Sequence, residues 1–224
     1  MNKTILVVAA HPDDEVLGCG GVMARHVNNG DKVHVVFMSD GVTSRTGADS
    51  KEVDVRKQAA KEAGNLLGIE QPPRFLGFPD NRMDSIVLLE IVQALEQVID
   101  EIEPEVVYTH HSGDLNIDHK ITHQAVMTAC RPQPGFCVRG IYSFEVLSST
   151  EWSTNNSFIP NYFVDISDTL ELKISAIKAY CAELRTFPHA RSIESIKALA
   201  KYRGASMGIL AAEAFKVERL ISKT

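Results

Sequence analysis

The sequence lacks long apolar runs, an excess of basic residues and a signal-peptide pattern. No apolar stretch approaches the roughly 18 residues that a membrane-spanning helix needs, so we expect no membrane span. The apolar run at 5–10 has no cleavage site of small residues and is followed at once by acids, which argues against a signal peptide. Lys and Arg number 23 against 29 Asp and Glu, a net charge of −6. Nucleic acids and anionic membranes bind basic surfaces, so neither is expected as a partner.

Cysteine is also scarce: the chain has four, at positions 19, 130, 137 and 181, and no C-x-x-C pair. This usage predicts a reduced, cytoplasmic protein without a disulfide framework. Cys130 and Cys137 invite comparison with zinc thiolates. Their wide spacing and the lack of a second pair argue against a structural zinc site.

What the sequence does contain is an ordinary globular composition, with 44% hydrophobic and 23% charged residues in 224. These proportions exclude a disordered or low-complexity chain. Internal repeats, linkers and blocks of charge are absent from the sequence. A chain of this length can bury a sizeable core, and we expect one large domain over residues 1–224.

Short β-rich runs alternate with amphipathic helical stretches along the chain. We expect strands at 5–10, 32–40, 74–78, 106–110, 140–146 and 161–167. We expect helices at 13–29, 51–67, 84–102, 118–130, 168–184 and 192–214, and a polar loop at 41–50. Strand–helix alternation predicts βαβ units, and therefore a single Rossmann-like, doubly wound α/β domain with a mainly parallel sheet and helices on both faces. Ligands of such sheets bind beyond the carboxyl ends of the strands.

The first of these strand ends carries the run His11-Pro12-Asp13-Asp14-Glu15. Proline followed by acids is a good helix start, but a helix start does not require His11. Three adjacent acids also crowd negative charge at the place where a ligand binds, which favours a bound cation. His11 and Asp14 are three residues apart across a strand-to-helix turn, so both can converge on one metal ion.

The strand at 106–110 is followed by a second polar run, residues 110–119, with the sequence HHSGDLNIDH. Two strand ends of this composition can supply a His/Asp/His set, which suits zinc and also iron or manganese. Three protein ligands leave positions open for water and substrate, as in catalytic sites. His119 and His123 are four residues apart on one helix face, and spacing does not decide which of the two is a ligand. His26 and His34 lie within expected elements and are read as structural.

A dinucleotide site is the main alternative at the first strand end, because Gly18-Cys19-Gly20-Gly21 follows it and Asp40 ends the next strand. The glycines lie inside the helix, however, and do not spell G-x-G-x-x-G. The turn itself holds acids where a pyrophosphate needs free N–H donors. We therefore interpret the glycines as positions of close helix packing beside the site.

Together these residues resemble the PIG-L/LmbE-like family of zinc-dependent de-N-acetylases, which act on N-acetylglucosamine-type amides. The resemblance rests on AHPDDE (10–15), D-x-N-x-D-H (114–119), Arg56 and FLGFPD (75–80), and on PHARS (188–192) and AAEAF (211–215). It implies a Zn²⁺-dependent hydrolase that converts a small N-acetylated amino sugar into acetate and a free amine. The residues that match family positions are the metal ligands His11, Asp14 and His119, the general base Asp13, the sugar-binding Arg56 and Asp80, and Asp118, which orients a neighbouring histidine.

The chain departs from many relatives at Asn116, where their second motif has a histidine that stabilises the oxyanion or protonates the leaving amine. Asparagine can donate a hydrogen bond but cannot deliver a proton at neutral pH. Either Asp13 handles both proton transfers or another histidine takes the role. His189 is the first candidate, ahead of His110 and His111. In some relatives the replacement comes from a neighbouring subunit, so the resemblance also allows a homo-oligomer.

Two other functions remain open. The metal site could hydrolyse a different small-molecule amide or an ester. A non-catalytic Rossmann-like binding protein predicts the loss of a ligand or of Asp13, and none is lost. Segments 41–50 and 147–160 are expected to frame the substrate, with Trp152 serving either as a sugar-stacking residue or as packing.

Overall fold

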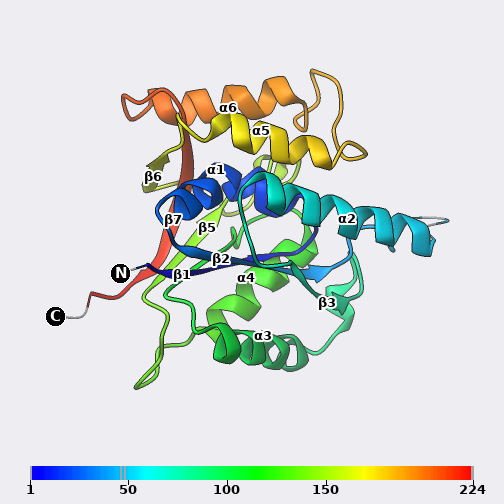
Figure 1. Cartoon of the computed structure of the whole chain (residues 1–224). Helices are drawn as coiled ribbons and strands as arrows, with labels where there is room; N and C mark the ends of the chain where they lie inside the picture. Colours follow the sequence, from blue (N-terminus) through cyan, green and yellow to red (C-terminus); the bar gives the residue numbers. More distant parts are fainter. Residues whose placement is uncertain (1, 46, 48, 223–224) are drawn as a thin grey trace.

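A seven-stranded sheet forms the centre of the computed structural model, which describes residues 2–45, 47 and 49–222 (Figure 1). Its strands are β1 (Thr4–Ala9), β2 (Lys32–Ser39), β3 (Arg74–Phe78), β4 (Val106–His110), β5 (Gly140–Phe144), β6 (Tyr162–Asp165) and β7 (Ala212–Leu220). The strand order is β3-β2-β1-β4-β5-β7-β6. The first five strands are parallel, and β7 runs antiparallel to β5 and β6. The expected mainly parallel, Rossmann-like α/β fold is confirmed.

Helices cover both faces of this sheet (Figure 1). One face carries α1 (Asp14–Asn28), α2 (Ser50–Leu66), α5 (Leu170–Ala179) and α6 (Ile193–Ala205), and the other carries α3 (Leu88–Ile102) and α4 (Ile117–Ala129). Two short 3-10 helices, η1 (Met83–Ser85) and η2 (Thr150–Trp152), lie in the connections. The expected helix at 84–102 therefore begins four residues late, at Leu88. Among the described residues, no helix is long and apolar enough to cross a membrane.

The central strand β1 has a continuous apolar sequence because both of its faces are buried. Ile5 and Val7 pack into the core beneath α1 and α2, whereas Leu6 and Val8 pack into the core beneath α3 and α4. All four side chains are buried, because helices cover both sides of the strand. β1 pairs with β2 and β4, and this pairing brings the carboxyl ends of the three strands to one edge of the sheet.

The prediction of one helix over 192–214 is wrong in its second half. α6 ends at Ala205, and residues 212–220 form β7 between β5 and β6. The sequence AEAFKVERL contains two Ala and two Glu together with Lys, Arg and Leu, all of which favour helices. Pairing with two neighbouring strands overrides that local preference. In the predicted loop at 41–50, residues 46 and 48 lie outside the described residues.

Helix α1 is broken at Cys19, whose φ of −145° and ψ of 26° are not helical. The break frees backbone groups, and a buried ion pair satisfies them. Glu213 accepts hydrogen bonds from the backbone N–H groups of Gly21 and Val22, and Lys173 donates to a backbone carbonyl of the same helix. Lys173 Nζ and Glu213 Oε1 are 2.6 Å apart. The AAEAF segment thus supports the helix that begins at the motif after β1.

Small residues on α1 allow close packing, as expected for its glycines. A Cβ atom at Gly18 would lie 2.3 Å from the ring of Phe144, and one at Gly21 would lie 2.9 Å from Ile166.

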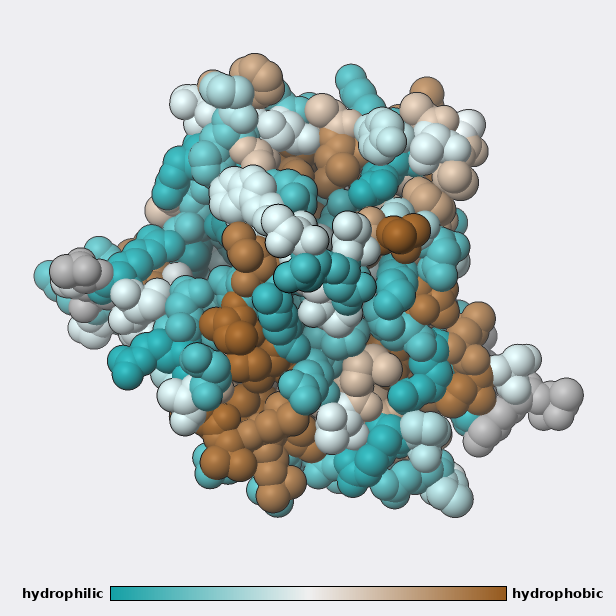
Figure 2. Space-filling view, turned by 180° about the vertical axis from the view of Figure 1, so that it is seen from behind, coloured by the Kyte–Doolittle hydropathy of each residue, from teal (hydrophilic) through white to brown (hydrophobic). Residues whose placement is uncertain are grey.

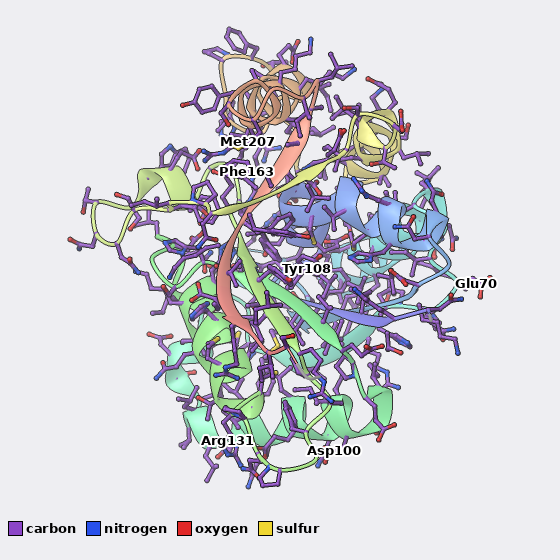
Figure 3. The ribbon with its side chains drawn as sticks, turned by 90° about the vertical axis from the view of Figure 1, so that its left-hand side faces the viewer. Glu70, Asp100, Tyr108, Arg131, Phe163 and Met207 are labelled. Carbon is purple, nitrogen blue, oxygen red and sulfur yellow. The ribbon has the colours of Figure 1, made fainter. Side chains whose placement is uncertain are left out.

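Inside the molecule, Tyr108 is buried and stacks on Tyr142, whereas Asp100 and Arg131 are exposed at the edge seen in Figure 3. Seen from behind, the surface is mostly polar, with hydrophobic side chains gathered toward the lower left of Figure 2.

Candidate metal centre

The candidate site lies where the sheet changes its direction of winding. β1 leads outward to β2 and β3, and β4 leads the other way to β5, so the carboxyl ends of β1 and β4 form a switch point. His11 lies two residues beyond the end of β1, and His110 is the last residue of β4. The first turn of α4 adds Asp118 and His119 from above the same edge.

Three side chains converge at this point with one ligand atom each. Oδ2 of Asp14 lies 3.2 Å from Nδ1 of His11 and 3.2 Å from Nε2 of His119, and these two nitrogens are 3.3 Å apart. In tetrahedral coordination with bonds of about 2.0–2.1 Å, neighbouring ligand atoms lie about 3.3–3.4 Å apart. The triangle therefore already has the dimensions of one face of a zinc tetrahedron.

Carboxylates behind both histidines set their orientation. Nε2 of His11 lies 3.2 Å from Asp118 Oδ2 and 3.2 Å from Asp80 Oδ1, and Nδ1 of His119 lies 3.1 Å from Asp114 Oδ1. A proton held on each of these outer nitrogens leaves a lone pair on each inner one. Two lone pairs and a carboxylate facing one point repel each other unless a cation lies between them.

The surroundings of Asp14 also favour a bound cation. Its Oδ1 is buried without a hydrogen-bond partner among the described residues, so an ion would satisfy an otherwise orphaned atom. Burial lowers the pKa of His119, but the charge of Asp14 and the hydrogen bond to Asp114 outweigh burial and raise this pKa to about 9. Burial raises the pKa of Asp14, yet both histidines hold it well below its usual range. Such a site keeps protons until a metal ion displaces them. His11, Asp14 and His119 therefore fit a divalent ion.

A second group, His11 with Asp80 and Asp118, has similar spacing. Its oxygens already accept protein hydrogen bonds: Asp118 from the backbone N–H groups of Asn81 and Met83, and Asp80 from the N–H and hydroxyl of Ser44. Burial raises the pKa of Asp80, but bonds from His11 and Ser44 bring it to about 2. This group acts as the support behind His11, and the match of Asp118 to a histidine-orienting carboxylate is consistent with its position.

Asp13 lies beside the triangle in an unusual backbone conformation. Its φ of 118° lies in the region that favours glycine, a strain often found at functional sites. Its Oδ2 is 2.9 Å from Nη1 of Arg191 and 3.9 Å from Nη1 of Arg56. Burial raises the pKa of Asp13 more than the two arginines lower it. A buried carboxylate with a raised pKa is suited to accepting a proton.

The carboxylate of Glu183 contacts both of the arginines that lie near Asp13. Glu183 Oε1 lies 3.0 Å from Arg56 and 2.8 Å from Arg45, and its Oε2 lies 3.6 Å from Arg191. The charges of Arg56 and Arg45 outweigh burial and lower the pKa of Glu183. The predicted sugar-binding Arg56 also lines a pocket of about 510 Å³ together with Val55 and residues 179–183.

Asn116, at the position of the missing histidine, and His189, the first candidate replacement, lie in different surroundings. Asn116 caps α4, where its side chain accepts from Asp118 N and donates to Asn81 Oδ1. His189 is exposed in the α5–α6 connection, where its ring lies edge-on to Trp152 at 6.4 Å. No described contact joins His189 to the metal triangle, and its role stays a prediction.

The other histidines near the site, His110, His111 and His123, each have a distinct set of contacts. His110 accepts a hydrogen bond from Ala10 N and stacks on His119 with ring centroids 3.9 Å apart, so it packs directly behind a candidate ligand. His111 bonds to the carbonyl of Asn156, and His123 bonds to the carbonyl of His110. Of the pair that spacing left open, His119 belongs to the triangle.

The sequence did not predict the roles of three residues of the site, Asp114, Glu183 and Arg191. Asp114 stood within a quoted motif, which was the available signal for it. Ser149 and Thr150 both donate to its carboxylate, so the 147–160 segment does border the site. Arg191 likewise lies within the PHARS segment (188–192), although nothing in that segment indicates a contact with Asp13, and Glu183 lies outside all of these motifs.

Proteins of known family are similar to this chain over most of its length. A family model described as PIG-L, GlcNAc-PI de-N-acetylase, matches residues 6–130. The uncharacterized deacetylase YaiS of Escherichia coli is 32% identical over 184 residues, covering 80% of this chain and 90% of its own. A 4-oxalmesaconate hydratase of Pseudomonas putida is 28% identical over 201 residues, 81% of this chain and 74% of that protein. A 1D-myo-inositol 2-acetamido-2-deoxy-alpha-D-glucopyranoside deacetylase of a Mycobacterium species is 26% identical over 238 residues, 84% and 76% of the two chains.

Solved structures share the fold. The N,N'-diacetylchitobiose deacetylase of Pyrococcus horikoshii superposes with a TM-score of 0.76 at 22% identity, covering 97% of this chain and 84% of its own. The 4-carboxy-2-hydroxymuconate hydratase GalB of Pseudomonas putida superposes with a TM-score of 0.80 at 24% identity, covering 99% and 98%.

Proposed function

Because the chain belongs to the PIG-L family of GlcNAc-PI de-N-acetylases, we propose that it is a metal-dependent hydrolase of N-acetylated amino sugars. The products would be acetate and a free amine. The observation that carries the proposal is the triangle of His11, Asp14 and His119 beside the buried Asp13. Relatives named as deacetylases of N-acetylated sugars support the same chemistry.

Each residue has a physical task in this reaction. A divalent ion, zinc in our proposal, would be held by His11, Asp14 and His119 and would supply Lewis acidity toward water and a carbonyl oxygen. Asp118 and Asp114 accept from the outer ring nitrogens of the two histidines, so that the inner nitrogens would be free to bind the ion. Asp13 takes the proton from the attacking water and passes it to the departing amine. Asn116 is limited to donating a hydrogen bond.

Binding of the sugar is assigned to Arg56 and Asp80. Arg56 is buried, bridges Asp13 and Glu183, and reaches the pocket between α2 and the end of α5, which has room for the part of the substrate away from the amide. Asp80 is already engaged by His11 and Ser44, so contact with a sugar would require one of these bonds to be shared.

A second candidate function is addition of water to an unsaturated acid. It is favoured by the 28% identity to the 4-oxalmesaconate hydratase over 81% of this chain. Both reactions need an activated water, so the metal triangle alone does not separate them. We prefer deacetylation because the matching family model is described as a de-N-acetylase and because YaiS, which is more similar to this chain than the hydratase, is named as a deacetylase.

The experiment that tests the proposal measures acetate and free amine after incubation of the zinc-loaded protein with a panel of N-acetyl sugars. The panel should include N-acetylglucosamine glycosides, nucleotide sugars, small N-acetyl amines, acetate esters and unsaturated dicarboxylic acids. Equimolar acetate and amine from a sugar amide supports the proposal. Acetate only from esters, or loss of the double bond in an acid without acetate release, contradicts it in favour of the alternatives.

A further inference from the structure

Arg191 ties together three segments that are distant in sequence. Its Nη1 lies 2.9 Å from Oδ2 of Asp13, and its Nε donates to Oγ of Ser148 at 2.6 Å. Nη1 also lies 3.6 Å from Glu183. The next residue, Ser192, caps α6 through its own side chain, which fixes the backbone from which Arg191 extends.

Asp13 needs such a partner. It is buried next to a second carboxylate, Asp14, and Glu183 adds further negative charge nearby. Two cations reach it, but Arg56 is 3.9 Å away and lies closer to Glu183, at 3.0 Å. Arg191 therefore makes the only hydrogen bond to the carboxylate of Asp13 among the described residues. That bond engages Oδ2 and leaves Oδ1 without a donor.

We propose that Arg191 is the positioning residue of Asp13, which fixes Oδ2 so that Oδ1 is presented to the reacting water. This inference rests on the proposed hydrolysis. The guanidinium of Arg191 is planar and is bonded at Nε to Ser148 and at Nη1 to Asp13, so it cannot rotate. A lysine ammonium would supply the positive charge but could not make both of these bonds in a fixed geometry. A proton acceptor displaced by about 1 Å can cost on the order of 10²-fold in rate.

The test compares Arg191→Ala and Arg191→Lys with wild type on the substrate identified by acetate release. We expect Arg191→Ala to lower kcat on the order of 10²-fold with little change in KM and unchanged zinc content. Arg191→Lys should retain only part of the activity. Added guanidinium, at concentrations far below those that unfold proteins, should restore part of kcat in Arg191→Ala but not in Asp13→Asn. Arg185→Ala is the matched control, because Arg185 lies in the same loop and is exposed, and among the described residues its side chain bonds only to carbonyls of that loop.

A measurement without turnover accompanies these assays. In the metal-free protein, Asp13→Asn and Arg191→Ala should be non-additive in thermal stability, because each removes the same ion pair. Additive effects, an unchanged kcat in Arg191→Ala, or a raised KM with unchanged kcat would each overturn the positioning role. A wild-type protein that releases no acetate from any sugar would instead contradict the proposed function, and it would do so before any variant is compared.

Discussion

Gly18 is the residue of α1 at which a single methyl group should disturb the candidate metal centre. A Cβ atom there would lie 2.3, 2.6 and 2.8 Å from three ring atoms of Phe144, a fully buried side chain. Carbon atoms in contact prefer about 3.5–4.0 Å, so the ring would have to move by about 1 Å. The ring of Phe144 packs edge-on against His110 at 4.9 Å, and His110 stacks on the candidate ligand His119 at 3.9 Å.

The size of the effect follows from two opposing contributions. Overpacking of a core costs about 1–3 kcal/mol, and a rigid, enclosed ring places Gly18→Ala near the upper end. Alanine returns at most about 1 kcal/mol of helix propensity. The net loss of about 2 kcal/mol should lower Tm by about 4–8 °C in a chain of this size. The displaced His110 should also weaken zinc binding, which a chelator competition assay measures.

Gly64→Ala is the matched control for this substitution. Gly64 lies inside α2, and an added Cβ would meet only Ile69, at 4.0 Å. There the gain in helix propensity should stand alone and raise Tm by about 2–4 °C. If Gly18→Ala left Tm unchanged or raised it as Gly64→Ala should, the close approach of α1 to Phe144 would be refuted.

Three further substitutions test the site. Asp13→Asn should keep fold and zinc while kcat falls about 10²–10⁴-fold, and retention of more than about a tenth of kcat would mean that another group is the base. His189→Ala should lower kcat about tenfold or more without loss of zinc; an unchanged kcat there, with a strong loss in Asn116→Ala, would give the role to the asparagine. The depressed pKa of Glu183 contributes stability that is present above its ordinary value of 4.5 and is lost as pH falls through the lowered value. Chemical unfolding across pH should therefore show wild type more stable than Glu183→Gln above about pH 4.5, with a difference that shrinks in acid; a pH-independent difference would contradict the ion pairs of Glu183.

The centre of the fold was predictable because its signals are local. The apolar run at 5–10 is buried on both faces, and the motif that follows it forms a strand-to-helix turn. Strand–helix alternation then places His11 and His119 at adjacent strand ends. That the chain forms one domain over residues 1–224 stays a prediction, as does a homo-oligomer.

What sequence could not supply depends on contacts between distant segments. The helix-favouring composition of 212–220 hides a strand that is held by β5 and β6. The same strand carries Glu213 to the break in α1. Arg191 and Asp13 are 178 residues apart, and only the path of the chain through α5 and into the α5–α6 connection brings them together. The choice between His119 and His123 likewise depends on which of them contacts His11 and Asp14.

The most direct test of the metal centre is elemental analysis of zinc, with acetate release measured on the same samples, for His119→Asn and His123→Asn. In both variants the new side-chain amide can keep the bond made by Nδ1, to Asp114 at position 119 and to the carbonyl of His110 at position 123, but lacks Nε2. We predict one zinc ion per chain and full activity in wild type, near-complete loss of both in His119→Asn, and retention of both in His123→Asn. Unchanged zinc in His119→Asn, or its loss in His123→Asn alone, would contradict the assignment of His11, Asp14 and His119 as the metal ligands.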